Sequence, residues 1–292
     1  MKKWSELRKM LKLHEKWRKK FAVICCVLAV ICFGTVFFVV YDMRRSYAIS
    51  EEKVEELRKL SEMAEPIKTG EEQTDSKGED LQAKAEQEKV ENPYAEVFRK
   101  NSDMAAWLFI EGTKIDYPVM QTPEDENYYL HRDFYGNEDQ AGCLILDTDS
   151  RLEGDMTTNQ IIHGHNMRVG TMFGELDLYQ DEEYCKDHSR IQLFTREMER
   201  NYEVIAVFYS QIYYTTDLVF KYYNFFEADT EEEFRYFYDN IKELSLFDTG
   251  VEAEFGDRFL TLSTCSYQVE DGRFVVVAKE VEPGDQFLQI RD

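Results

Sequence analysis

The sequence predicts a mostly-β domain with added helices, preceded by one N-terminal transmembrane helix. Residues 21–41 contain no charged side chain, and this apolar run is long enough to cross a bilayer as a helix. From about residue 93, short β-branched and aromatic runs recur between turn residues, which is typical of a barrel or sandwich. Only one later stretch has a clear helical pattern, so an alternating βαβ architecture is disfavoured.

The N-terminal 20 residues are rich in Lys and Arg, which predicts a cytoplasmic segment followed by a span at 21–41 and an extracellular remainder. A cleaved signal peptide would have the same orientation. The apolar run is too long for one, however, and Arg44-Arg45 stand where a small-residue cleavage site should lie. We therefore expect an uncleaved, single-pass membrane anchor.

Residues 42–92 are predicted to be a spacer between this anchor and a folded domain at 93–292. Residues 51–65 place apolar side chains at helical intervals, whereas residues 66–92 are almost entirely polar and cannot bury enough surface to fold. The chain carries a net charge of −23 although its first 45 residues are basic, so the extracellular part is strongly acidic. Such a surface excludes nucleic acid as an expected partner.

The folded part should contain eight strands and one long helix. Thr230 and Glu233 form a capping box at the start of a helix over 230–246, whose apolar residues share one face. Asp271-Gly272 is a turn that should join the last two strands as a hairpin. The predicted strands are residues 107–110, 117–120, 143–146, 160–163, 191–194, 202–209, 259–264 and 273–279.

Three cysteines lie outside the predicted span, and their odd number argues against a disulfide framework. Cys143 sits in an apolar run and is interpreted as a buried strand residue. Cys185 is interpreted as structural or incidental, and a bridge between these two stays open. Cys265 is left as a thiol that requires a functional explanation.

Three residues together indicate a reactive centre. Cys265 ends a strand and follows Ser263 and Thr264, whose polar side chains suit a cleft better than a core. Arg273 interrupts an apolar strand, where an unpaired buried charge would be costly. His165 follows Gly164 at the end of another strand and could point into a cleft. In such a centre the thiolate can attack a carbonyl, the imidazole can transfer a proton, and the guanidinium can stabilise the oxyanion that forms.

These segments resemble the sortase family, and class B in particular. The resemblance covers about residues 95–282 and rests on Thr-Leu-Ser-Thr-Cys at 261–265, followed by Arg273 and preceded by His165. The stretches at 164–174, 113–119 and 129–136 and the helix before the Cys265 strand are also similar to class B members. His163 is a departure, because members of the class often have Tyr there.

The resemblance implies a closed eight-stranded sortase-type β-barrel and a cysteine transpeptidase of the Gram-positive cell envelope. Its substrate would be a secreted protein with a C-terminal sorting motif, cleaved after Thr through a thioacyl-enzyme. The acceptor would be an amine of a peptidoglycan precursor or a pilin lysine. Cys265 would be the nucleophile, His165 the general acid and base, and Arg273 the oxyanion clamp, with Ser263, Asn127 and Leu130 contacting the peptide.

No cofactor and no metal is expected, because the sequence shows neither a His/Asp/Glu cluster at ligand spacing nor a Gly-rich phosphate loop. Two other functions remain for comparison. A cysteine transpeptidase acting on stem peptides would normally carry a His-Gly segment shortly before the Cys, and none is present. A noncatalytic extracytoplasmic envelope adaptor would need the anchor, spacer and β-domain but not the three reactive residues.

Overall fold

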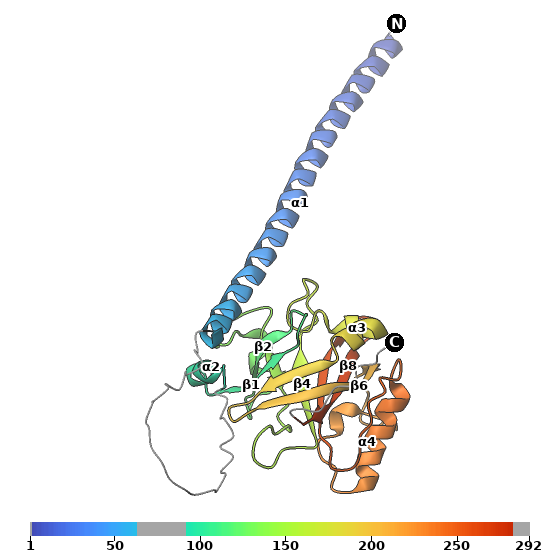
Figure 1. Cartoon of the computed structure of the whole chain (residues 1–292). Helices are drawn as coiled ribbons and strands as arrows, with labels where there is room; N and C mark the ends of the chain where they lie inside the picture. Colours follow the sequence, from blue (N-terminus) through green and yellow to red (C-terminus); the bar gives the residue numbers. More distant parts are fainter. Residues whose placement is uncertain (1, 63–91, 283–292) are drawn as a thin grey trace, which may run out of the picture. The chain divides into compact units, whose positions relative to one another are not determined.

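The computed structural model describes residues 2–62 and 92–282 of the 292-residue chain, without most side chains before Leu28. The chain divides into two compact units, Met1–Glu51 and Glu52–Asp292. A single long helix, α1 (Lys2–Glu62), makes up the described part of the first unit and continues into the second (Figure 1). The second unit therefore begins already at Glu52, within the segment that the sequence assigns to the spacer. The polar stretch at 66–92 lies almost wholly outside the described residues.

Large apolar side chains of α1 in the first unit are exposed, among them Phe33, Phe37 and Phe38 at 77%, 74% and 67%. The expected membrane span at 21–41 includes side chains at 22–24, 26 and 27 that are outside the described set. Among the described residues, no helix combines the length and apolarity that crossing a membrane requires.

The eight strands of the second unit close into one barrel in the order β1-β2-β3-β4-β7-β8-β6-β5. This confirms the predicted barrel and every predicted strand. Two neighbouring pairs, β2–β3 and β4–β7, are parallel. The strands are β1 (Met104–Phe109), β2 (Asp116–Met120), β3 (Leu144–Leu146), β4 (Asn159–Gly164), β5 (Arg190–Phe194), β6 (Glu199–Gln211), β7 (Phe259–Ser266) and β8 (Gly272–Val281).

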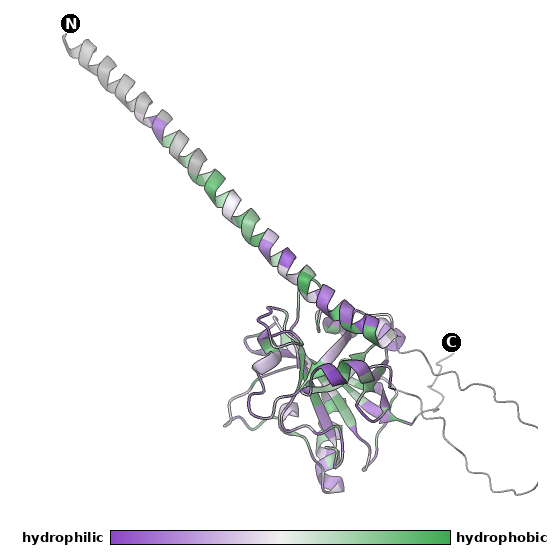
Figure 2. Cartoon of the chain, turned by 90° about the vertical axis from the view of Figure 1, so that its left-hand side faces the viewer, coloured by the Kyte–Doolittle hydropathy of each residue, from purple (hydrophilic) through white to green (hydrophobic). Residues whose placement is uncertain are grey.

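Alternation along the strands divides the side chains between the barrel interior and its outer surface. On β7, Leu260 and Leu262 belong to the interior core, whereas Phe259 belongs to a second cluster outside the barrel. On β8, Phe274 and Val276 likewise point inward. Figure 2 shows the hydrophobic strands surrounded by more hydrophilic loops and helices. Odd-numbered residues of both strands thus face the outside of the barrel.

The long predicted helix is α4 (Glu231–Leu244), which lies beside β6 and β8 (Figure 1). Its capping box is formed as predicted, with Thr230 accepting from the Glu233 amide and Glu233 accepting from the Thr230 amide. Phe234 and Phe237 are buried against outward-facing strand residues such as Phe259. The helix therefore closes one side of the barrel's outer surface.

The last turns of α1 pack against the barrel. Leu57 is fully buried in a cluster with Trp107 of β1. Arg58 contacts Asp116 of β2, with 2.8 Å between Nε and Oδ2 and 2.8 Å from Nη2 to the backbone carbonyl. The Trp107 indole donates to the other Asp116 carboxylate oxygen at 2.6 Å. The second unit thus uses the end of α1 as part of its core.

The second unit also contains two buried cysteines and several short helices. Cys143 and Cys185 are buried and both are free, so the structure does not contain the bridge between them that the sequence left open. Burial raises the pKa of Cys185 to about 12, which makes its thiol inert near neutral pH. The short helices are α2 (Ala95–Lys100), η1 (Tyr128–His131), η2 (Leu176–Gln180), α3 (Glu182–Asp187) and η3 (Tyr222–Asn224).

Candidate functional site

Strand register places the three predicted reactive residues at one edge of the barrel. In the parallel pair β4–β7, Gly164 lies opposite Thr264, so His165 and Cys265 are the next residues along neighbouring strands. In the antiparallel pair β7–β8, Cys265 lies directly opposite Arg273. Residues that are side by side in register project to the same face of a sheet. The fold therefore gathers a histidine, a thiol and a guanidinium from segments about a hundred residues apart.

The shared face is the outside of the barrel. Cys265 and Arg273 are odd-numbered residues on β7 and β8, and both are half-buried. Gly164 instead faces the interior, where an added Cβ would approach Leu144 to 2.5 Å and Phe173 to 2.7 Å. Because glycine fits there, β4 can end tightly packed against the core and turn at His165.

Cys265 is a free thiol at the open end of β7, and its backbone is held by the side chain of Asn166. The Asn166 amide donates to the Cys265 carbonyl at 3.0 Å and to the Asp177 carboxylate at 2.8 Å. Tyr267 follows the end of β7, and its hydroxyl donates to the Asn166 carbonyl at 3.3 Å. Asn166, the residue after His165, thus links the segment that follows β4 to the backbone of Cys265.

His165 is held in a defined tautomer. Its Nε2 lies 2.9 Å from the carbonyl of Leu130, and a carbonyl can only accept, so Nε2 carries the proton. This leaves Nδ1 as the nitrogen that can take up or release a second proton. The ring stacks on His131 with 5.2 Å between centroids. Burial lowers the pKa of His165, and the neighbouring His131 adds to this effect, so the neutral imidazole predominates near pH 7.

Within the described part of the chain, the hydrogen bonds of Arg273 go to carbonyls of its own turn. Its Nη1 donates to Asp271 at 3.2 Å and to Gly272 at 3.0 Å. Among the described residues, no carboxylate forms an ion pair with it. A guanidinium has five N–H donors, so several remain available to a ligand beside Cys265.

The three predicted peptide-contacting residues have different environments. Ser263 is buried, two residues before Cys265 on the outer face, and its hydroxyl lies 2.7 Å from that of Tyr222. Asn127 is exposed and precedes η1. Leu130 lies on η1 and supplies the carbonyl that holds His165. The segment from Asn127 to Leu130 therefore reaches the candidate site through a backbone contact.

The end of α1 braces the loop that follows η1. Lys53 pairs with Asp133 at 2.7 Å, and Asp133 also accepts from the backbone amides of Tyr135 and Asn137, each at 2.9 Å. These contacts lower the pKa of the Asp133 carboxyl against the opposing effect of its burial. The loop fixed in this way comes directly after the Leu130 carbonyl that binds His165.

Sequence reasoning missed some residues of this site. Asn166 lies within the stretch that carries the resemblance, but its bonds to Asp177 and Cys265 depend on the fold. Asp177 on η2 and Tyr222 on η3 have no local signal, because neither forms a motif with its sequence neighbours. His163 also lies on the outer face of β4, and its Nε2 is 3.3 Å from the carboxylate of Asp147.

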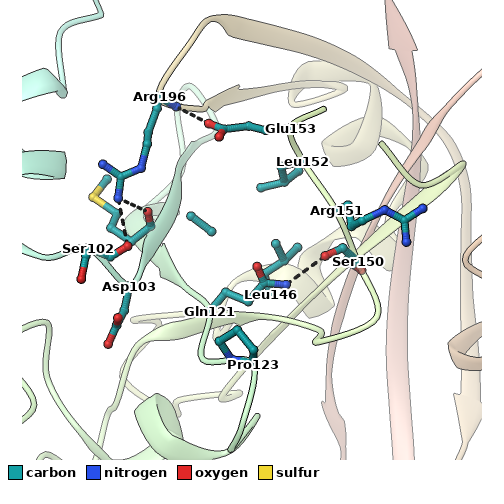
Figure 3. A pocket seen from close by; sticks show the side chains of 12 residues that line it. Ser102, Asp103, Gln121, Pro123, Leu146, Ser150, Arg151, Leu152, Glu153 and Arg196 are labelled. Atoms are coloured by element: carbon teal, nitrogen blue, oxygen red, sulfur yellow. Dashed lines mark hydrogen bonds between the residues drawn. The ribbon is translucent and has the colours of Figure 1, made fainter. Parts of the chain in front are cut away.

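A pocket of about 400 Å³ lies apart from these residues (Figure 3). It is bounded by the start of β1, the ends of β2 and β3, and the loop that carries Arg151 and Glu153. The Arg196 guanidinium donates to the carbonyls of Ser102 and Met104 at its rim. None of the predicted reactive residues lines it, so volume alone does not identify the candidate site.

Comparison with known proteins matches this arrangement. A family model of the sortase domain matches residues 108–281. Sortase B of Listeria monocytogenes is 32% identical over 194 residues, covering 66% of this chain and 75% of the relative. Sortase B of Staphylococcus aureus is 28% identical over 200 residues, covering 67% of this chain and 78% of the relative.

Solved structures agree with the sequence comparisons. The crystal structure of sortase B from Bacillus anthracis in complex with AAEK1 has a TM-score of 0.64 and 28% identity, covering 82% of this chain and 99% of that one. The Staphylococcus aureus sortase B–substrate complex has a TM-score of 0.59 and 27% identity, covering 67% of this chain and 88% of that one.

Proposed function

Because the chain belongs to the sortase family and is a class B transpeptidase, we propose that Cys265 is its nucleophile, His165 its general acid and base, and Arg273 its oxyanion clamp. One observation carries this assignment. The register of β4, β7 and β8 places the three residues side by side on one face. With transpeptidase activity established through the family, the noncatalytic adaptor is no longer a candidate.

The first half of the reaction forms a thioester. His165 takes the proton of the Cys265 thiol at Nδ1, the resulting thiolate attacks the carbonyl carbon of the Thr in a sorting motif, and the carbonyl oxygen becomes an oxyanion. When this tetrahedral intermediate collapses, the C–N bond to the next residue breaks and His165 gives its proton to the leaving amine. Since Nε2 is bound to the Leu130 carbonyl, the proton is exchanged at Nδ1.

The second half regenerates the thiol enzyme. An incoming amine attacks the thioester, His165 removes its proton, and Cys265 leaves as the thiolate. Arg273 serves both halves, because the same oxyanion forms twice and the guanidinium has donors that the protein leaves unused. One such donor typically contributes on the order of 10²–10³ in rate.

We propose that the substrate is the C-terminal sorting motif of a secreted protein, ending in Thr-Gly or Thr-Asn. The acceptor is an amine of a peptidoglycan precursor or a pilin lysine. The solved structure of Staphylococcus aureus sortase B in complex with a substrate supports a substrate-binding site in this family. In this chain Ser263, Asn127 and Leu130 would contact the peptide, with Leu130 also fixing the imidazole.

We further propose that residues 21–41 anchor the enzyme in the cell membrane, with residues 1–20 cytoplasmic and the catalytic unit outside. The uncharged run, the basic segment before it and the exposed phenylalanines of α1 support this topology. Protease added to intact cells should then remove the catalytic unit and leave the N-terminal stub. Mature protein beginning near residue 45 in the medium would refute it.

The test of function uses the full chain in detergent with a panel of fluorogenic sorting peptides and an added amine. The expected result is cleavage after Thr and a peptide–amine product identified by mass. Cys265→Ala should abolish both, whereas Cys143→Ala, a buried thiol away from the site, should retain them. Cleavage by Cys265→Ala at a near-normal rate would overturn the assignment.

A further inference from the structure

Three ligand-type side chains from separate segments converge beside the candidate site. Glu126 precedes η1, Asp147 follows β3, and His163 lies on the outer face of β4. One ligand atom from each lies within 4.8 Å of the other two. In the sequence these residues have no metal-ligand spacing, so the cluster exists only through the fold.

The geometry suits a single ion with small adjustment. Nitrogen and oxygen ligands lie about 2.0–2.2 Å from a zinc-type ion, so two atoms on one ion are at most roughly 4.4 Å apart. The Nε2 of His163 is already 3.3 Å from Oδ2 of Asp147. Since no pair of ligand atoms is more than 4.8 Å apart, the Glu126 carboxylate needs to move by at most a few tenths of an ångström.

Two of the three ligands are held rigidly. His163 lies in a central strand, paired with Ile145 on one side and Ser263 on the other. Asp147 donates its backbone amide to Ile161 and accepts from Gln121 through its carbonyl, both at 2.9 Å. Its Oδ1 accepts from the Asp149 amide at 2.9 Å, which turns Oδ2 toward His163.

The charge of the cluster is not balanced by the protein. Glu126 and Asp147 lie close enough to repel, with Asp149 nearby, and no Lys or Arg within the described ranges forms an ion pair with any of these three. A divalent cation would remove this repulsion, and the partly exposed His163 and Asp147 leave a path to solvent.

We propose that Glu126, Asp147 and His163 form a binding site for one divalent transition-metal ion, with zinc as the representative case. An imidazole with two carboxylates favours such ions over Mg²⁺ and Ca²⁺, which prefer oxygen ligands alone. Because Glu126 adjoins Asn127, the bound ion would fix the loop before η1 to β4. The site concerns binding and does not depend on the catalytic roles proposed above.

The test measures zinc binding to the full chain, prepared without a histidine tag and stripped with a chelator. Cys265→Ala serves as the parent, so that the half-buried Cys265 thiol near His163 cannot bind the metal. Isothermal titration should show a saturable site with one equivalent of Zn²⁺. His163→Phe and Asp147→Asn should each weaken it at least tenfold, whereas His188→Gln, whose ring stacks on Tyr184, should match the parent.

Two further measurements keep the test decisive. Zn²⁺ should raise the melting temperature of the parent and of His188→Gln but not of His163→Phe, with circular dichroism confirming that each is folded. Ca²⁺ should give no comparable binding. Zinc binding that is unaffected by His163→Phe, equal loss in His188→Gln, or tighter binding of Ca²⁺ than of Zn²⁺ would overturn the proposal. The same holds if the parent binds no zinc.

Discussion

Truncation of Leu57 to Ala should destabilise the catalytic unit although Leu57 lies outside the barrel. Its side chain is fully buried against the cluster that contains Trp107. Removing such a Leu typically costs about 3–5 kcal/mol, because transfer energy is lost and a cavity remains. For a unit of this size each kcal/mol lowers the melting temperature by roughly 2–4 °C. A fall of at least about 6 °C is therefore expected.

The assay is thermal unfolding of the full chain in detergent, followed by near-UV circular dichroism, which reports on packed aromatic rings such as Trp107. Glu56→Ala is the matched control, because Glu56 is the exposed neighbour on the same helix. It should change the melting temperature by no more than about 2 °C, since exposed substitutions usually stay within about 0.5 kcal/mol. If Leu57→Ala behaves like Glu56→Ala, the end of α1 is not part of the folded unit.

Three further predictions concern the site. Arg273→Lys should lower kcat/KM on the order of 10²–10³-fold despite retaining the charge, because an ammonium cannot reproduce the planar fork of donors; a normal rate would remove the clamp role. Asn166→Ala should cost about 1–3 kcal/mol of stability, because it leaves the Asp177 carboxylate and the Cys265 carbonyl without the Asn166 amide. In a double-mutant cycle with Asp177→Asn, the two stability losses should not be additive. Strictly additive losses would disprove the coupling. Burial lowers the pKa of His165, so the acid limb of the pH profile of kcat/KM should have its midpoint below about pH 6.5. Because His131 also lowers this pKa, His131→Gln should move the midpoint to higher pH. A midpoint above about pH 6.5 in the unsubstituted protein would contradict this.

The lowered pKa of His165 also makes the stability of the fold fall as the pH falls. His165 with a lowered pKa is neutral in the fold over a range where the unfolded chain binds a proton, so its contribution is complete above about pH 6.5 and is lost as the pH falls through the folded pKa. The pH dependence of unfolding should therefore decrease in His165→Gln over that window. Unchanged dependence would show that His165 is not the buried group.

The strands and the main helix could be predicted because their signals are local. Short runs of β-branched and aromatic residues predicted β7 and β8, and Thr230 with Glu233 predicted the start of α4. The ends were less accurate where pairing extends a strand. β6 runs from Glu199 to Gln211 because these terminal residues pair with Phe194 and Gly272. The residue types at these two ends do not predict a strand.

That Cys265, His165 and Arg273 lie together could be predicted because they stand at strand ends within recognisable segments. Their supports could not, because they depend on contacts between distant segments. Leu130 holds His165 through a backbone carbonyl, which any residue type could supply. The burial of Leu57 could not be predicted from the helical pattern at 51–65, because it requires the face of β1. The cluster of Glu126, Asp147 and His163 likewise arises from three separate elements.

The most direct test of the central claim is covalent labelling of the nucleophile. The full chain is incubated with a sorting-motif peptide in which a thiol-reactive group replaces the Thr carbonyl, and the adduct is located by mass spectrometry of proteolytic fragments. The account predicts one adduct, on Cys265, that a scrambled peptide does not form and that Cys265→Ala eliminates. Labelling at Cys143 or Cys185 instead, or equal labelling by the scrambled peptide, would contradict it.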